Sequence, residues 1–176
     1  MGALSMCSQI TLRAGLVISL IAFSAFAMAA SAQTAAAPST IDALIGEWSG
    51  EGKVLGADGR LTLRFARVMK GRFLELTYLA EPAQGGTFEG RALYRIAADC
   101  AGDGQWFDSN GASYAIVSRC AEGALETTWG NERIQGSSRY SPKDGQLSTA
   151  DFIKGADGEL REFTAVMLTR AQGGTD

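Results

Sequence analysis

The segment "TFEGRALYRIA", residues 87–97, decides the fold because its side chains alternate in character. One parity carries apolar or small residues: Phe88, Gly90, Ala92, Tyr94 and Ile96. The other parity carries Leu93 and three charged residues: Glu89, Arg91 and Arg95. Successive side chains of a strand point to opposite faces, so this pattern predicts a strand with one buried face and one face in water.

Glycine-rich turn signals divide the rest of the chain into similar short segments. They are "GADGR" (56–60), "EPAQGG" (81–86), "AGDG" (101–104), "SNG" (109–111), "AEG" (121–123), "KDG" (143–145) and "GADGE" (155–159). Asn-Gly and Asp-Gly pairs supply the positive φ angles that two-residue hairpin turns require. The segments between the turns predict about ten strands, at 46–55, 61–70, 72–80, 87–97, 104–109, 112–119, 124–130, 133–141, 147–154 and 160–170.

The last of these strands alternates less regularly than the others. On one face we expect Leu160, Thr164, Val166 and Leu168. On the opposite face we expect Arg161, Phe163, Ala165 and Met167. Ahead of the first strand, Thr40 is expected to cap one helical turn over residues 41–45, because its hydroxyl can accept from the amides that follow.

The order of the strands favours a closed barrel over a sandwich. Antiparallel strands joined in sequence leave two exposed edges unless the first and the last strand pair. Closure would make "GEWSG" (46–50) a neighbour of "LTR" (168–170). The sequence thus predicts an all-β fold, a closed antiparallel up-and-down barrel of about ten strands with one short N-terminal helical turn.

Residues 1–32 are typical of an export signal. Arg13 precedes the apolar run "AGLVISLIAFSAFAMAA", and "ASA" at 30–32 offers a small-residue cleavage site. A membrane anchor is the competing interpretation, but the run is short for a span and no Lys or Arg follows it before Lys53. We expect cleavage near Ala32, a linker at 33–40, one domain at 41–172, and a periplasmic or secreted product without a membrane span.

The composition argues against several classes of function. The chain has no histidine, which removes the commonest general base, the commonest metal ligand and the usual proximal ligand of haem. Its formal net charge is −3, and no basic run could follow a phosphate backbone. We therefore expect no metal site, no cofactor and no nucleic-acid partner, and a Ser-His-Asp triad is impossible.

Cys100 and Cys120 are the two cysteines beyond the export signal. In an oxidising compartment an even pair usually forms a disulfide, so we expect this bridge. Cys100 falls in the turn after the fourth strand and Cys120 at the end of the sixth, and strands two apart are separated by about 10 Å. The loop around Cys100 would have to fold inward to bring the two Cα atoms within about 7 Å.

Several pieces of the chain resemble a known group of barrels. They are "LIGEWSGEG", "FEGRALYR", "QWFDSNG", "GSSRYS" and "FTAVMLTR". The Gly-x-Trp at 46–48 and the terminal Arg170 resemble the opening and closing residues of the calycins, the lipocalin and fatty-acid-binding-protein group. Together the pieces are similar to a family of uncharacterised bacterial lipocalin-like domains over nearly the whole mature chain. The resemblance implies that Trp48 plugs one barrel end with Arg170 laid across its indole.

Nitrobindin-like barrels, which are more distant relatives, hold haem through a histidine. This chain departs from that pattern because it has none. Haem held through Tyr or Met is the alternative that stays open, although such ligation is unusual.

Aromatic residues in the central strands are candidate ligand contacts: Tyr94, Trp106, Tyr114, Trp129 and Tyr140. An aromatic-lined interior is what a barrel offers to an apolar ligand. The alternative is that these rings fill the core, since large aromatics dominate burial whether or not a ligand binds.

Four charged residues have two interpretations each. By alternation Asp108 shares a face with Trp106, where burial would raise its pKa, but it can also accept hydrogen bonds from the turn at 109–111. Glu126 and Asp151 also lie in predicted strands, and Arg139 could point inward to meet one of them or a ligand carboxylate, as interior arginines do in fatty-acid-binding relatives. Charged residues on alternating strands usually face water, which favours the surface for these three.

The function that these features favour is binding of a small apolar or amphipathic molecule inside an exported barrel. One alternative is an enzyme on the same barrel, with Asp108 or Glu126 as acid or base and a neighbouring Tyr as partner. Another alternative is a partner-binding module whose barrel is solid.

Overall fold

The computed structural model describes residues 39–97 and 100–171. The predicted export signal at 1–32 and most of the predicted linker lie outside the described residues, and the predicted boundaries of the domain stay a prediction. The described elements are α1 (Thr40–Leu44), β1 (Gly46–Val54), β2 (Ala57–Val68), β3 (Phe73–Pro82), β4 (Phe88–Ala97), β5 (Cys100–Asp108), β6 (Ser113–Ala121), β7 (Ala124–Gly130), β8 (Gln135–Lys143), β9 (Gln146–Lys154) and β10 (Leu160–Arg170).

The ten strands form one closed antiparallel barrel in which every strand pairs with its neighbours in sequence and β1 pairs with β10. At this closing seam Trp48 lies opposite Arg170, and Ser49 lies opposite Thr169. Closure leaves no unpaired strand edge in the barrel. The predicted fold class, including the pairing of the first and last strands and the single short helix, is confirmed.

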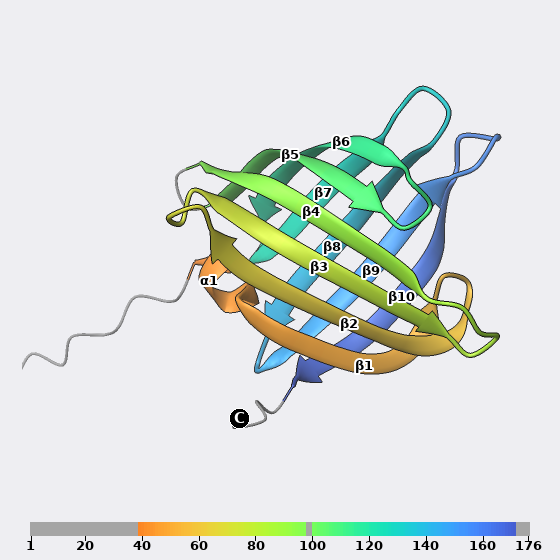
Figure 1. Ribbon diagram of the computed structural model, residues 1–176, viewed down its shortest axis with the longest axis horizontal. Coiled ribbons are helices and arrows are strands. Elements are labelled where there is room, and N and C mark those ends of the chain that lie inside the picture. Colours follow the sequence, from red (N-terminus) through yellow and green to blue (C-terminus); the bar gives the residue numbers. More distant parts are fainter. Residues whose placement is uncertain (1–38, 98–99, 172–176) are drawn as a thin grey trace, which may run out of the picture. The chain divides into compact units, whose positions relative to one another are not determined.

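The barrel has two different ends (Figure 1). We call the end that carries α1 the helix end, and the end that carries the β1–β2, β3–β4, β5–β6, β7–β8 and β9–β10 turns the hairpin end. The N-cap of α1 is Ser39 rather than Thr40, since the Ser39 hydroxyl accepts from the Asp42 amide at 3.2 Å. Ile41 and Leu44 of α1 are fully buried, so the helix closes the barrel at this end.

Trp48 and Arg170 form the plug at the helix end. The Trp48 indole N–H donates to the Leu44 carbonyl at 2.7 Å, and the Arg170 guanidinium lies 4.2 Å from the centre of the Trp48 ring. Arg170 also donates to the carbonyls of Ile45 and Ala43, at 2.7 and 3.1 Å. One arginine thus joins the last strand to β1 through a cation–π contact and to the helix through carbonyl groups that the short helix leaves unpaired.

The core divides by residue type between the two ends. Leucine and phenylalanine side chains fill the helix end and are buried to 1 % exposure or less: Leu63, Phe65, Leu74, Leu76, Leu125, Leu147 and Leu168. Tyr78, Trp106, Trp129 and polar residues line the interior toward the hairpin end, and Tyr94 and Tyr140 lie beside the leucines at mid-depth. Aliphatic side chains pack to high density, so the leucine-rich helix end is well filled.

Two of the predicted turns are wrong in position. The first hairpin turns at Leu55 and Gly56, which have φ angles of +51° and +87°, whereas Asp58 and Gly59 lie within β2. The "AGDG" segment (101–104) belongs to β5. Gly59 and Gly104 allow neighbouring strands to approach closely, because a Cβ atom at either position would meet the backbone of the neighbouring strand.

The predicted pairing of Cys100 with Cys120 is confirmed, with a Cα–Cα distance of 5.7 Å. The expected gap between them does not arise, because Cys100 is the first residue of β5 and β5 is adjacent to β6. Gly104 faces Ile116 across this pair of strands, and the same register places Cys100 opposite Cys120. The bridge lies at the helix end.

Candidate functional site

A cavity of about 250 Å³ occupies the interior at the hairpin end. Sixteen residues line it: Leu55, Tyr78, Phe88, Tyr94, Trp106, Asp108, Tyr114, Ile116, Thr127, Trp129, Ile134, Ser138, Tyr140, Asp151, Ile153 and Phe163. Half of these residues are aromatic. The structure brings six of the seven predicted ligand contacts into this one cavity: Tyr94, Trp106, Asp108, Tyr114, Trp129 and Tyr140.

Exposure of the lining residues increases toward the hairpin end. Tyr94 and Tyr140, deep in the barrel, are each 2 % exposed. Ile134, in the β7–β8 loop, and Ile153, near the end of β9, are 39 % and 38 % exposed. The cavity therefore has a floor formed by tyrosine rings and a mouth among the hairpins.

The aromatic rings of the cavity contact one another in two groups. Trp106 stacks near Phe88, with ring centres 6.4 Å apart and planes 18° apart, and meets the edge of Tyr78 at 5.8 Å. On the other wall Trp129 lies 6.0 Å from Tyr114 and 6.4 Å from Phe163. Such contacts fix the orientations of the rings and leave π faces available to a ligand.

Two glycines each make room for a tryptophan indole of the adjacent strand. A Cβ atom added at Gly90 of β4 would overlap the Trp106 ring, and one added at Gly136 of β8 would overlap the Trp129 ring. Neither glycine has a positive φ angle. Glycine is therefore needed at these positions because it leaves space above the backbone, and not because of its backbone conformation. Each indole can therefore lie flat against a strand beside the open space.

Asp151 of β9 is a carboxylate inside the barrel, 3 % exposed. Its Oδ2 accepts from the Tyr78 hydroxyl at 3.0 Å, while its Oδ1 is buried without a hydrogen-bond partner. Burial raises the pKa of Asp151 from 3.8 to about 6, against the opposing effect of the nearby hydroxyls of Ser138, Tyr78 and Thr164. Asp151 can therefore exchange its proton near neutral pH, and one of its oxygens lacks a donor.

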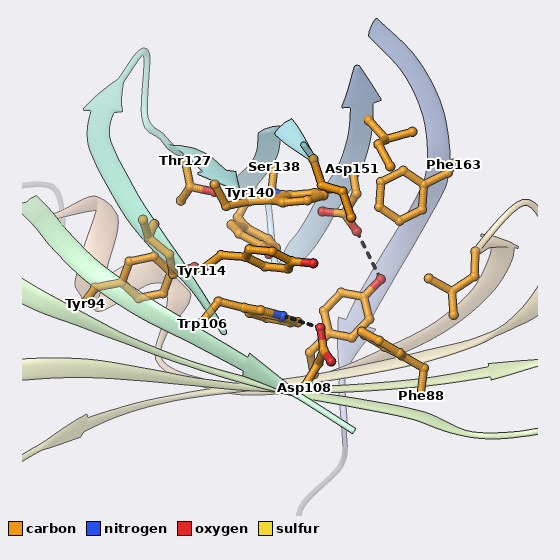
Figure 2. Close-up of a pocket in the computed structure, with 16 residues that line it drawn as sticks. Phe88, Tyr94, Trp106, Asp108, Tyr114, Thr127, Ser138, Tyr140, Asp151 and Phe163 are labelled. Atoms are coloured by element: carbon orange, nitrogen blue, oxygen red, sulfur yellow. Dashed lines mark hydrogen bonds between the residues drawn. The ribbon is translucent and has the colours of Figure 1, made fainter. Parts of the chain in front are cut away.

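Asp108 of β5 holds the turn that follows it and also reaches the edge of the cavity. Its Oδ1 accepts from the amides of Asn110 and Ala112, at 3.0 and 3.1 Å, and so holds the β5–β6 turn. Its Oδ2 accepts from the Trp106 indole N–H at 3.1 Å at the edge of the cavity, as the dashed line in Figure 2 marks. The carboxylate thus orients one wall of the cavity while it is anchored in the turn.

Three buried phenols border the floor of the cavity. Burial, and then the negative charge of Asp151, raise the pKa values of Tyr78, Tyr94 and Tyr140 above 10. These hydroxyls remain protonated at physiological pH and can act as hydrogen-bond donors. Figure 2 shows Tyr94, Tyr114, Tyr140 and Asp151 around the same space.

Arg139, considered as a possible ligand contact, does not line the cavity. Ser138 and Tyr140 on either side of it face the interior, so alternation along β8 directs Arg139 outward. On the outer face Arg139 pairs with Glu126 and with Glu122. Glu126 also accepts from Arg119 at 2.8 Å, so this carboxylate lies outside the cavity.

Asp151, Tyr78 and Phe163 are the main site residues that sequence reasoning missed. Asp151 continues the interior parity of Leu147 and Thr149, and the expectation that a charged residue faces water concealed this signal. Phe163 was expected to face away from Thr164. A bulge between Glu162 and Thr164 lets Phe163 line the cavity while Thr164 is buried beside Tyr78, and no residue pattern in the sequence marks this bulge.

Within residues 39–97 and 100–171, no helix is long and apolar enough to cross a membrane. In the same ranges no three side chains of His, Cys, Asp or Glu gather as they would around a metal ion. No protein-family model matches the chain, and a search of curated proteins finds no match to it.

Proposed function

We propose that this protein binds a small apolar or amphipathic molecule in the cavity at the hairpin end of its barrel. The observation that carries the proposal is the cavity itself, about 250 Å³ of space lined by eight aromatic rings and a few polar atoms. Concave, mainly apolar sites with a small number of oriented polar groups are typical of small-molecule binding.

The size of the cavity limits the ligand. A buried apolar cavity of roughly 150 Å³ is enough to take up benzene. At about 250 Å³ the space suits one ring with a short side chain. This unfilled volume favours ligand binding over a module with a solid barrel.

The arrangement of acids supports binding more than catalysis by the carboxylates first considered. Glu126 is paired with arginines on the outer face. Asp108 uses both of its oxygens to hold the turn and the Trp106 indole. Neither carboxylate is free to act as a general base on a bound molecule.

Two further observations agree with an exported binding protein. The barrel is compatible with the calycin-like fold that the sequence resembles, and interior binding is what that resemblance implies. The Cys100–Cys120 bridge is compatible with an oxidising compartment. Export to the periplasm or medium and membership of a lipocalin-like family are parts of this proposal.

The test uses three probes that share a phenethyl body: 2-phenylethanol, 2-phenylethylamine and 3-phenylpropanoate. Calorimetric titration should detect binding of at least one of them to the purified protein. Thr127 of β7 lines the cavity and Thr128, the next residue, is exposed on the outer face. Thr127→Phe should therefore weaken binding at least about tenfold by filling the space, and Thr128→Phe should leave it unchanged.

Binding of none of the probes, together with no small molecule retained by the protein in native mass spectrometry, would contradict the proposal. Equal loss of affinity in the two threonine variants would place the binding site elsewhere. Circular dichroism of both variants serves as the check that the barrel still folds.

A further inference from the structure

The charges that line the cavity are all of one sign. Asp108 and Asp151 contribute carboxylates, and among the residues that the structure describes no Lys or Arg lines the space. The chain contains no histidine. Lys53 and Lys154, near the hairpin end, lie on the outward parity of their strands and contact Glu162 and Gln135 there. The field inside the cavity is therefore negative.

Asp151 is the stronger attractor of the two acids. Its Oδ1 is buried without a hydrogen-bond partner, whereas both oxygens of Asp108 accept hydrogen bonds. A buried carboxylate with an unpaired oxygen is unfavourable when ionised, and a positive charge in the cavity beside it compensates that cost. A ligand that brings a donor with a positive charge gains most there, because hydrogen bonds between charged groups are the strong ones.

We propose that the cavity takes a cationic ligand, a small amine whose positive charge lies against Asp151 and whose apolar body lies among the aromatic rings. This inference rests on the binding function proposed above and assigns the chemical class of the ligand. The Trp106 and Trp129 indoles and the Tyr114 ring offer π faces, which attract ammonium groups as well as apolar surface.

Other ligand classes fit the lining less well. An anion would enter a negative field and meet no cation among the described lining residues. A neutral molecule of the same shape would gain the aromatic contacts but not the electrostatic attraction to Asp151. Hard metal cations prefer a shell of six or more oxygens, while half of the lining residues here are aromatic.

The groups that face Asp151 decide how binding depends on pH. Tyr78 of β3, Tyr94 of β4 and Tyr140 of β8 stay protonated because their pKa values lie above 10. Ser138 of β8 and Thr164 of β10 do not titrate, and Asp108 of β5 is the other acid of the cavity. Since the pKa of Asp151 is about 6, its charge develops between pH 5 and 7.

The experiment compares the three phenethyl probes, which have similar bodies and differ in charge. At pH 7.5 we expect 2-phenylethylamine to bind at least about tenfold more tightly than 2-phenylethanol, and 3-phenylpropanoate to bind most weakly. The affinity for the amine should fall as the pH is lowered to 5, while the affinity for the alcohol stays constant.

Two variants that each remove one negative charge show which carboxylate causes the preference for the amine over the alcohol. Asp151→Asn keeps the shape of the side chain, so it should abolish the preference for the amine while the alcohol binds as before. Glu126→Gln removes a carboxylate from the outer face and should leave the preference intact. A preference that survives in Asp151→Asn would overturn the role of Asp151.

The results of these titrations distinguish failure of this inference from failure of the proposed binding function. If the alcohol or the acid binds as tightly as the amine, the cavity binds ligands but the cationic class is wrong. If no probe binds and no molecule is retained, the proposed function fails and the inference falls with it.

Discussion

Asp151 shows how much one residue can alter the energetics of this barrel. In the unfolded chain the pKa of Asp151 is near its ordinary value of 3.8, and in the folded protein burial raises it to about 6. Between these two values the folded state binds more protons than the unfolded state, so this group lowers stability as the pH rises through that window. Above pH 6 the folded protein carries an ionised carboxylate inside an aromatic cavity.

The first prediction concerns Asp151→Asn in the absence of ligand. The amide cannot ionise, so at pH 7 the variant should be more stable to urea than the wild type by up to about 3 kcal/mol, the free energy that corresponds to the shift in pKa. This advantage should shrink toward zero at pH 4. A difference in stability that does not change between pH 4 and 7 would contradict the assignment of the shift to Asp151.

The sequence predicted much of the site residue by residue, but not its central charge. Their positions in the predicted central strands made Trp106, Trp129, Tyr94, Tyr114 and Tyr140 candidate ligand contacts, and all five line the cavity. Asp151 was missed because the preference of charged residues for water outweighed its interior parity. The same preference was right for Arg139, which was considered as a possible ligand contact and pairs with Glu126 on the outer face.

At the scale of elements, neighbouring strands are fitted to each other by side-chain size. Gly90 and Gly136 leave the space in which the Trp106 and Trp129 indoles lie. The disulfide between Cys100 and Cys120 joins β5 to β6 at the helix end. The strand pattern and most turns were predictable because alternation and turn residues are local signals. The bulge in β10 and the turn at Leu55 were not, because pairing between strands sets them.

A second prediction tests the fit between Gly136 and Trp129. In Gly136→Ala the methyl group should displace the indole, break its 3.1 Å hydrogen bond to Ser138 and crowd the Phe152 carbonyl oxygen, 2.6 Å from the new Cβ. We expect a loss of about 1–3 kcal/mol in stability, a shift of tryptophan emission and weaker ligand binding. Gly102→Ala in β5 is the matched control, because a Cβ atom there would have only ordinary contacts, the nearest at 3.6 Å. Similar losses in the two variants would show that the space beside Trp129 is not special.

A third prediction concerns the disulfide. The bridge closes a loop of 20 residues, and its removal in Cys100→Ser/Cys120→Ser should lower the free energy of unfolding by about 3 kcal/mol. Ligand affinity should not change, since the bridge and the cavity lie at opposite ends of the barrel. Urea unfolding of the wild type with a reductant should reproduce the stability of the double variant. An unchanged midpoint in both experiments would show that the bridge does not form.

At the scale of the whole molecule, the residues that stabilise the barrel and the residues that line the cavity lie toward opposite ends of its axis. The helix end holds the leucine-rich core, the disulfide and the Trp48–Arg170 plug, whereas the hairpin end holds the cavity. The closed barrel was predictable from the number and order of the strands. The division of its interior was not, because it depends on which residues of ten strands meet at the same depth, and strand stagger in the folded barrel sets that depth.

The three tryptophans provide the most direct test that a ligand enters the hairpin end, because two line the cavity and the third lies in the plug. Their indole N–H resonances can be followed by two-dimensional NMR during a titration with 2-phenylethylamine. The Trp106 and Trp129 resonances should shift together and saturate, while the Trp48 resonance stays in place. Unchanged Trp106 and Trp129 resonances at high ligand concentration, or a shift confined to Trp48, would contradict binding in the cavity.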